Sequence, residues 1–404
     1  MARGVGRPLE IAVAGCGPAG LAAALLLHRD GCRVTLFERF QAPRPIGSGL
    51  MMQPTGMGVL DALGLGETMR QRGAVVGRLF GASAPSGRVV LDVRYAALGR
   101  KGGCGYGVHR AALFQVLHDA VVAQGLAMET GRDVVTSELA GTGRRLRFAD
   151  GSSAGPFDLV VDALGHASNL APPCGRPLAY GALWASLDWP GGGDLNPAAL
   201  EQRYRQASVM VGVLPIGLAP GRAARQAAFF WSLRADRLAA WREAGLDAWK
   251  AEVIEVWPAV RPLLDQVEDA DELTFARYTH RMLRTPAEPA LVHIGDAWRS
   301  SSPQLGQGAN MALLDAYALA LSLGEAPDVS EALDGFVRRR RRHAALYHRL
   351  SAMFTPVYQS DSRVLPLIRD LVVGPVSKLW PATAIQAAMV SGLIGAPLGP
   401  VGLG

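Results

Sequence analysis

The chain begins with a glycine pattern set between a strand and a helix. LEIAVAG has the composition of a short strand, GCGPAG follows it, and LAAALLLHRDG has helical character up to Gly31. A second strand, RVTLFER, comes next. Gly15, Gly17 and Gly20 therefore form GxGxxG at the turn of a βαβ unit. The pattern predicts an α/β fold whose first two strands are parallel.

These glycines have the properties of a phosphate-binding turn. Gly15 allows a tight turn, Gly17 lets the backbone approach a pyrophosphate, and Gly20 permits close helix packing. Glu38 ends the second strand 18 residues after Gly20, where a carboxylate can accept both ribose hydroxyls of an adenosine. The pattern predicts a dinucleotide, NAD or FAD, and a glutamate here disfavours NADP. The alternative is a glycine turn in an unrelated α/β protein.

Composition excludes several other classes of protein. A chain of 404 residues with 49% hydrophobic and 19% charged residues is globular and long enough for two or three domains. The net charge of +6 comes from arginines spread along the chain, which does not predict a nucleic-acid partner. The four cysteines show no metal-ligand spacing, so we expect no metal site and a reducing, cytoplasmic setting. Prolines interrupt the apolar segment 379–404, which is therefore not expected to span a membrane.

Later segments change in character. Helical periodicity is present at 54–72, 109–124 and 238–264, and from 309 almost to the C-terminus. ALWASLDW, QASVMVGVLPIG and RQAAFFWSLRA are rich in β-branched and aromatic residues and predict an antiparallel sheet. We therefore expect a second, β-rich domain within the α/β framework.

Five segments in order carry a resemblance to a known family. They are GCGPAG with FER, PRPIGSGLMMQPTGMGVLDALGLG, GYGVHRAALFQVL, FDLVVDALGHAS and LVHIGDAWRSSSPQLGQGANMALLDAYALA. Their order and spacing resemble the FAD-dependent aromatic hydroxylases, the group A flavoprotein monooxygenases related to p-hydroxybenzoate hydroxylase. The resemblance implies a Rossmann-like FAD-binding domain with an inserted antiparallel β-sheet substrate domain and C-terminal helices. The implied boundaries are 1–75, 100–175 and 275–325 for the FAD-binding domain, 76–99 and 176–274 for the sheet domain, and 326–404 for the helical region.

The resemblance also implies which residues hold FAD. Asp296 would bond a ribityl hydroxyl, although capping a helix is its alternative role. The loop that includes Gln307 would present backbone N–H groups to the pyrimidine end of the isoalloxazine. Arginines would hold the phosphate or ribityl region. The residues assigned to the cofactor are Gly15, Gly17, Ala19, Gly20, Glu38, Arg39, Arg44, Arg110, Asp296, Pro303, Gly306, Gly308 and Asn310.

Three positions depart from the family pattern. Leu164 stands where an aspartate is usual, residues 169–171 lack the expected arginine, and Arg299 beside Trp298 replaces a histidine. The motif around Leu164 is linked in the family to handling both FAD and NAD(P)H. NADH or NADPH is still the expected reductant. No second GxGxxG follows a strand, so no separate nicotinamide domain is expected, and the resemblance implies that NAD(P)H visits the flavin transiently.

The implied chemistry is monooxygenation in secondary metabolism. Reduced FAD would react with O2 to give a C4a-hydroperoxide, which transfers one oxygen atom to a small, mostly apolar or aromatic metabolite. No catalytic residue is assigned; Tyr278 and His280 are candidates for a base. Candidate pocket residues, each equally compatible with an ordinary core, are Met52, Gln53, Trp184, Tyr204, Met210, Phe230 and Trp231.

Other functions remain open. A flavin-dependent halogenase would need a WxWxIP segment, which the chain lacks; an isoprenoid reductase or oxidase and a non-catalytic FAD-binding partner protein are the further alternatives. The arginine run 338–342 is expected to be a solvated helix face. Its alternative is peripheral membrane contact through anionic lipid, together with the apolar segment 379–395. The sequence does not indicate an oligomeric state.

Overall fold

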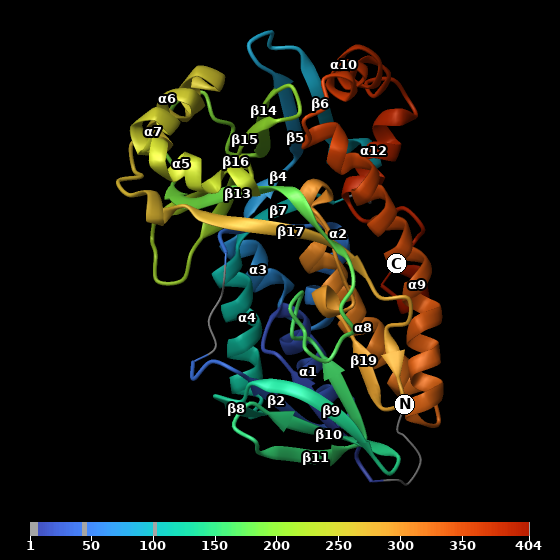
Figure 1. Ribbon diagram of the computed structural model, residues 1–404. Helices are drawn as coiled ribbons and strands as arrows, with labels where there is room; N and C mark the ends of the chain where they lie inside the picture. The colour runs from blue at the N-terminus through green and yellow to red at the C-terminus, as the bar shows by residue number, and fades with distance from the viewer. Residues whose placement is uncertain (1–6, 43–46, 100–102, 404) are drawn as a thin grey trace.

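A six-stranded sheet, built from strands of both halves of the chain, forms one layer of the fold (Figure 1). The computed structural model describes residues 7–42, 47–99 and 103–403. The strand order is β18-β19-β12-β1-β2-β8, and all pairs are parallel except β18 with β19. The strands are β1 (Glu10–Ala14), β2 (Arg33–Glu38), β8 (Ala127–Thr130), β12 (Leu159–Asp162), β18 (Ala287–Glu288) and β19 (Leu291–His293). The predicted βαβ unit is therefore present.

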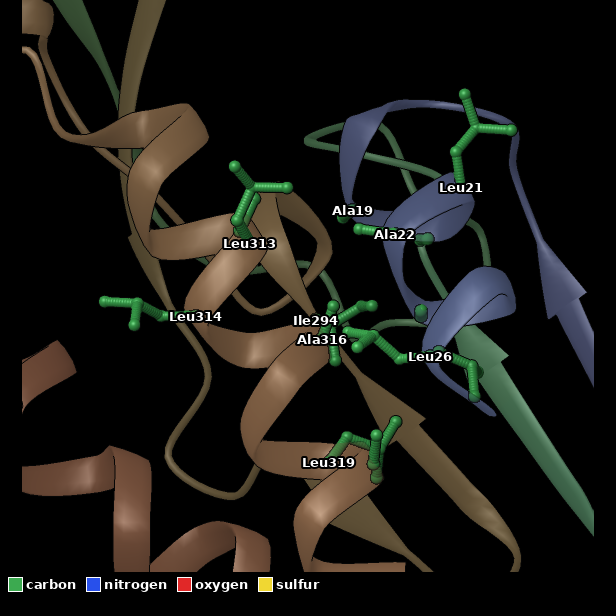
Figure 2. Packing of buried hydrophobic residues seen from close by; sticks show 14 of the residues in the cluster. Ala19, Leu21, Ala22, Leu26, Ile294, Leu313, Leu314, Ala316 and Leu319 are labelled. Atoms are coloured by element: carbon green, nitrogen blue, oxygen red, sulfur yellow. The ribbon is translucent and has the colours of Figure 1, made fainter. Parts of the chain in front are cut away.

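The two faces of this sheet bury different layers. Alternate residues of β1, Ile11 and Val13, face helices α1 (Pro18–Arg29), α4 (Arg110–Ala123) and α8 (Gly308–Glu325). Figure 2 shows Ala19 and Ala22 of α1 on the side of that helix that faces α8, which carries Ala316 in the same buried cluster. The other face is covered by a three-stranded antiparallel sheet of β9 (Val134–Ala140), β10 (Gly143–Phe148) and β11 (Ser153–Phe157).

A second large sheet has the order β20-β17-β13-β16-β15-β14-β5-β6. Its strands are β5 (Arg78–Ser83), β6 (Val89–Arg94), β13 (Arg176–Asp188), β14 (Ala199–Arg205), β15 (Val209–Leu218), β16 (Arg225–Arg234), β17 (Thr274–Met282) and β20 (Arg299–Ser300). The pairing is antiparallel as predicted, apart from β14 with β5, which are parallel. That pair joins two distant parts of the chain and needs no hairpin.

The outer face of this second sheet packs under α5 (Leu238–Ala244), α6 (Leu246–Val256) and α7 (Arg261–Leu264). Its inner face is turned toward a small sheet of β3 (Gly49–Met52), β7 (Gly105–His109) and β4 (Ala74–Val76). The predicted helix at 54–72 is two helices, α2 (Pro54–Ala62) and α3 (Gly66–Arg72), because Gly64 adopts φ +76° between them.

The C-terminal part is helical. A 30-residue helix, α9 (Val329–Tyr358), lies along α8 and leads into α10 (Val364–Ile368), a π-turn at Arg369–Val373, α11 (Gly374–Val376) and α12 (Ala382–Val390) (Figure 1). Within the described residues no helix is both long and apolar enough to cross a membrane. The division of the chain into domains at the residues given above stays a prediction.

Candidate cofactor and active site

The glycine turn combines two packing constraints with one open position. A Cβ on Gly15, which has φ +104°, would lie 2.6 Å from the carbonyl oxygen of Ala163. A Cβ on Gly20 would lie 2.0 Å from the carbonyl oxygen of Gly15. A Cβ on Gly17 would meet no described protein atom within 4 Å. Gly15 and Gly20 therefore serve packing, whereas Gly17 leaves free space at the N-terminus of α1, as a bound phosphate requires.

Glu38 is fixed beside this turn. Its Oε2 accepts a hydrogen bond from the backbone N–H of Cys16 at 3.1 Å, and its Oε1 accepts one from Phe40 at 3.1 Å. Two acceptor positions thus remain for ribose hydroxyls. Burial and the Glu38 charge raise the pKa of Cys16 to about 12, so the thiol stays protonated. Arg39 is exposed, and its guanidinium carbon lies 4.7 Å from the ring centroid of Phe40.

Asp296 lies among positive charges, close to the start of α1 and the first turns of α8: an added Cβ on the adjacent Gly295 would lie 3.1 Å from Ala19 Cβ and 3.3 Å from Ala312 Cβ. It sits in the 3-10 turn Gly295–Ala297 directly after β19 and caps no helix there. The carboxyl is reachable by solvent, yet the surrounding protein raises its pKa, opposed by the positive charges of Arg110 and Arg299. Its carboxylate makes no hydrogen bond to any residue that the structure describes. A free, accessible carboxylate near two arginines fits a ligand-binding role.

Arg110, at the start of α4, brings positive charge toward Asp296. Its backbone N–H donates to the carbonyl of Ser48 at 2.8 Å. Its guanidinium lies against Gly47, where an added Cβ would be 2.7 Å from Nη1. Its charge also reaches Tyr278. The second predicted arginine, Arg44, lies outside the described residues.

The loop after Pro303 is tied to β3 by one buried amide. Asn310 Oδ1 accepts from the backbone N–H of Gln53 at 2.8 Å, and its Nδ2 donates to the carbonyls of Met51 at 2.9 Å and Gly306 at 3.0 Å. The Asn310 side chain thus holds backbone in place, and its predicted cofactor contact would have to come from its N–H. Helix α8 begins at Gly308, where the first N–H groups of a helix lack carbonyl partners.

Of the two pocket residues predicted near β3, Met52 and Gln53, the first lies elsewhere. Met52 is fully buried in the core between α1, α2 and α8, because neighbouring strand residues point to opposite faces. Met51 instead joins the cluster on the inner face of the large sheet. Gln53 is buried; its Oε1 accepts from Tyr95 Oη at 2.5 Å, and its Nε2 has no partner among the described residues. An added Cβ on Gly306 would lie 3.7 Å from that Nε2.

The inner face of the large sheet brings several predicted residues together. Trp184 and Phe230 have ring centroids 4.7 Å apart. Met210 and the fully buried Tyr204 belong to the same cluster as Phe230. Trp231 does not: it faces the outer side with Trp249, because it follows Phe230 directly in β16. The prediction for Trp231 was therefore wrong, and the other four share one aromatic face.

The two candidate bases occupy different surroundings. Trp184 Nε1–H donates to Tyr278 Oη at 2.9 Å, and burial raises the pKa of Tyr278, so its phenol is neutral at physiological pH. Burial lowers the pKa of His280. His280 lines a separate cavity of about 300 Å³ with Tyr180 and Thr355. The structure therefore places Tyr278 beside the aromatic face and His280 apart from it.

The comparison with known protein families identifies this architecture. Residues 8–156 and 201–351 match the family described as FAD binding domain. The chain belongs to this family. Together with the similar proteins below, the match makes it a group A flavoprotein monooxygenase with FAD as its cofactor.

Curated relatives cover most of the chain. A 3-amino-4-hydroxybenzoate 2-monooxygenase from Streptomyces cremeus is 29% identical over 370 residues, which cover 85% of this chain and 86% of the relative. A 6-methylpretetramide 4-monooxygenase from Streptomyces rimosus is 28% identical, covering 92% of this chain and 90% of the relative.

Solved structures share the fold at lower identity. Klebsiella pneumoniae HpxO complexed with FAD and uric acid superposes with a TM-score of 0.81 at 20% identity, covering 96% of this chain and 98% of that chain. The tetrameric form of 2-methyl-3-hydroxypyridine-5-carboxylic acid oxygenase gives 0.77 at 19% identity, covering 95% and 96%. The likeness confirms the predicted fold.

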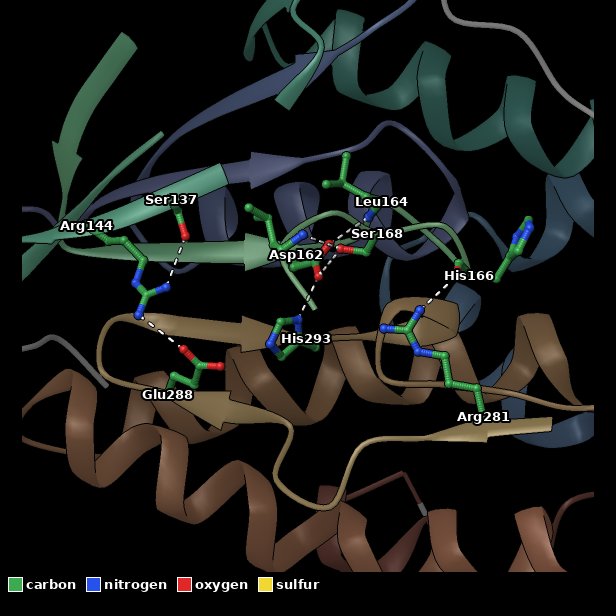
Figure 3. Close-up of polar contacts among 10 residues, drawn as sticks. Ser137, Arg144, Asp162, Leu164, His166, Ser168, Arg281, Glu288 and His293 are labelled. Carbon is green, nitrogen blue, oxygen red and sulfur yellow. Dashed lines mark hydrogen bonds and ion pairs between the residues drawn. The ribbon is translucent and has the colours of Figure 1, made fainter. Parts of the chain in front are cut away.

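A buried carboxylate, that of Asp162, bonds the backbone of Leu164, the residue that departs from the family pattern. Asp162 accepts from the backbone N–H of Leu164 at 3.0 Å and from Ser168 Oγ at 2.6 Å, and lies 2.6 Å from His293 Nδ1 (Figure 3). Asp162 and Leu164 are two residues apart. The sequence analysis did not single out Asp162. The signal that could have found it is an acidic residue two positions before Leu164, where the family usually has aspartate. Nearby, Arg281 Nη1 donates to the carbonyl of His166 at 2.7 Å.

Arg299 belongs to a buried ionic cluster centred on Asp315. Asp315 Oδ2 accepts from Arg299 Nη1 at 2.7 Å and from the backbone N–H of Gly295 at 3.1 Å. Its Oδ1 accepts from Arg340 Nε at 2.9 Å. Arg340 is 1% exposed, so the expectation of a solvated face for residues 338–342 is wrong at this position. The cluster fixes the turn that carries Asp296.

His343 extends this cluster to the C-terminal segment and predicts a pH effect on stability. Arg340 Nη1–H donates to His343 Nδ1 at 3.1 Å, and Nε2–H donates to the carbonyl of Gly392 at 3.0 Å. Burial and the Arg340 charge lower the pKa of His343 to about 3. An unfolded histidine titrates near pH ~6.5, so protonation below that pH favours the unfolded chain.

We therefore expect the free energy of unfolding to be highest above about pH 6.5. By pH 5 it should fall by about 2 kcal/mol, because the histidine binds a proton in the unfolded chain and not in the folded one. Urea unfolding of wild type and His343→Gln at pH 7 and pH 5 measures this. The wild type should lose more of its free energy of unfolding than the variant over this interval. Equal losses in the two proteins would contradict a neutral buried histidine.

Proposed function

We propose that this protein uses NADH or NADPH and O2 to insert one oxygen atom into a small, mostly apolar or aromatic metabolite. The free space beside Gly17, at the N-terminus of α1, is the observation that carries the proposal. It is the place where a dinucleotide phosphate would meet the backbone N–H groups. The turn that carries Asp296 and the first turns of α8 lie next to the start of α1, because Gly295 packs near Ala19 and Ala312.

The residues around the glycine turn and Asp296 suit the successive parts of FAD. Glu38 would accept the adenosine ribose hydroxyls, and Asp296 a ribityl hydroxyl, with Arg110 supplying positive charge. The N-terminus of α8, beginning at Gly308, would stabilise negative charge at the pyrimidine end of the isoalloxazine. When bound, FAD supplies the electron transfer and oxygen chemistry that side chains lack.

The sheet offers an apolar wall with a neutral hydrogen-bond donor. Trp184 and Phe230 would exclude water from the substrate, which protects a reactive oxidant from side reactions. Tyr278, held by Trp184, keeps its proton and would donate to an oxygen of the substrate. Relatives named for 3-amino-4-hydroxybenzoate and 6-methylpretetramide support an oxygen-bearing aromatic ring as the substrate class.

Anaerobic reduction tests the proposal. We expect NADH or NADPH, mixed with the holoenzyme without O2, to bleach the visible flavin absorbance, faster when a hydroxylated aromatic acid is present. Readmitting O2 should restore the absorbance and yield a product heavier by one oxygen atom. Its label should come from ¹⁸O2 and not from labelled water.

Two results would contradict the proposal. Failure to bleach with either nicotinamide would favour a flavoprotein that receives electrons through a partner. Bleaching and reoxidation without oxygenated product from any hydroxylated aromatic or isoprenoid probe would favour an oxidase or reductase.

A further inference from the structure

The C-terminal segment exposes an unusual amount of apolar surface. Thirteen large apolar side chains are exposed in the described part of the chain, and eight of them fall between residues 364 and 385. Monomeric proteins scatter such residues, so this concentration marks an interaction surface. We call six of them the C-terminal patch: Val364, Leu367, Leu371, Val372, Leu379 and Trp380, which are 56–84% exposed.

The patch follows helical spacing. Val364, Leu367, Leu371 and Val372 occupy positions i, i+3, i+7 and i+8 along the consecutive helical turns of α10 and the π-turn. This spacing puts them on one face. The face points outward, whereas an ordinary surface helix turns its apolar face to the core.

A buried arginine holds the segment in this orientation. Arg369 is fully buried; its Nε donates to Asp370 Oδ1 at 2.7 Å, and its Nη2 donates to the carbonyl of Gln206 at 3.2 Å. Its guanidinium carbon also lies 4.9 Å from the ring centroid of Tyr204. Asp370 in turn accepts from Ser83 Oγ at 2.9 Å. The apolar face is thus presented by an anchored segment.

Cations outnumber acidic residues in the segment that carries the patch. Asp370 is the single acidic residue in the sequence from 362 to 404, and Arg369 already pairs with it. Arg363 and Lys378 are both exposed and border the patch. Exposed apolar side chains with a tryptophan, bordered by cations, are the composition of segments that lie in a membrane interface.

Helix α9 adds basic charge before the patch. Arg342, Arg349 and Met353 are exposed and spaced by seven and four residues, so they share one side of that helix. The charge pattern favours an anionic surface as the occupant.

We propose that the C-terminal patch docks this protein onto anionic membrane lipids. Trp380 and the leucines enter the boundary between headgroups and acyl chains, while Arg363 and Lys378 meet lipid phosphates. The proposal rests on the surface alone and does not depend on the reaction catalysed in the flavin site.

Vesicle binding by the full-length holoenzyme tests it. We expect cosedimentation with phosphatidylcholine vesicles that contain phosphatidylglycerol, weakening as salt is raised, and little binding to phosphatidylcholine alone. The double variant Leu371→Ser/Trp380→Ser should reduce binding about tenfold or more. Val122→Ser is the matched control, because Val122 is 60% exposed on α4, outside the patch, and this variant should bind as wild type does.

A second measurement locates the contact. Brominated lipids in the anionic vesicles should quench tryptophan fluorescence of the wild type, and Trp380→Phe should remove most of that quenching while retaining binding. Absence of binding to anionic vesicles at low salt would overturn the proposal, as would equal loss of binding with Val122→Ser. A wild-type dimer that the double variant converts to a monomer in lipid-free solution would overturn it too, by showing that a second copy covers the patch.

Discussion

Replacing Asp315 by asparagine should lower the free energy of unfolding by about 3–5 kcal/mol. Asp315 is fully buried between the guanidinium groups of Arg299 and Arg340, which are 7% and 1% exposed. Asparagine keeps the shape but removes the charge, so two buried cations lose their counterion. Because Asp315 also accepts the N–H of Gly295, the turn carrying Asp296 should loosen at the same time.

Urea unfolding followed by circular dichroism measures this loss, both without FAD and with FAD in excess. Asp61→Asn provides the control: Asp61 pairs with Arg70 at 2.6 Å but is 45% exposed, and exposed pairs contribute little. The Asp61 variant should unfold almost as wild type does. If Asp315→Asn did the same, the buried cluster would not be needed for stability.

The features that could be predicted from the sequence are those that depend on neighbours along the chain. The βαβ unit follows from one strand, one glycine turn and one helix, and Glu38 lies beside the turn because it ends the second strand. Segments rich in β-branched and aromatic residues predicted the second, antiparallel sheet. Asp296 lies in the turn directly after β19, and its contact with FAD stays a prediction.

The errors concern which side a residue faces and which distant residue it meets. Met52 and Trp231 were each assigned to the pocket, but both lie one residue away from the strand position that faces it. The direction of a face in a strand buried on both sides has no local signal. Arg340 could not be distinguished from its neighbours, because its burial comes from the packing of α9 on α8. The same holds for Asp162 and His293, which are 131 residues apart.

A substitution at Gly17 in the glycine turn should weaken FAD binding without affecting folding. Gly17→Val should fold with the stability of the wild-type apoprotein, because Gly17 has φ −73° and ψ 175°, an extended conformation that valine adopts readily. Its side chain would enter space that no described protein atom occupies within 4 Å of the Cβ. If that space belongs to the FAD pyrophosphate, affinity for FAD should fall at least about tenfold, since overpacking costs about 1–3 kcal/mol and about 1.4 kcal/mol is tenfold.

Two further substitutions make the test specific. Gly58→Ala in α2 also adds a Cβ that meets no atom within 4 Å, but away from the glycine turn, so this variant should stay yellow. Gly20→Val should fail to fold, because its Cβ would lie 2.0 Å from the carbonyl oxygen of Gly15. FAD titration and thermal unfolding of each apoprotein distinguish the three cases, since bound FAD raises the melting temperature of a variant that still binds it. Normal FAD affinity in a well-folded Gly17→Val would mean that the cofactor phosphates lie elsewhere, and Glu38 would then lose its proposed role at the adenosine ribose.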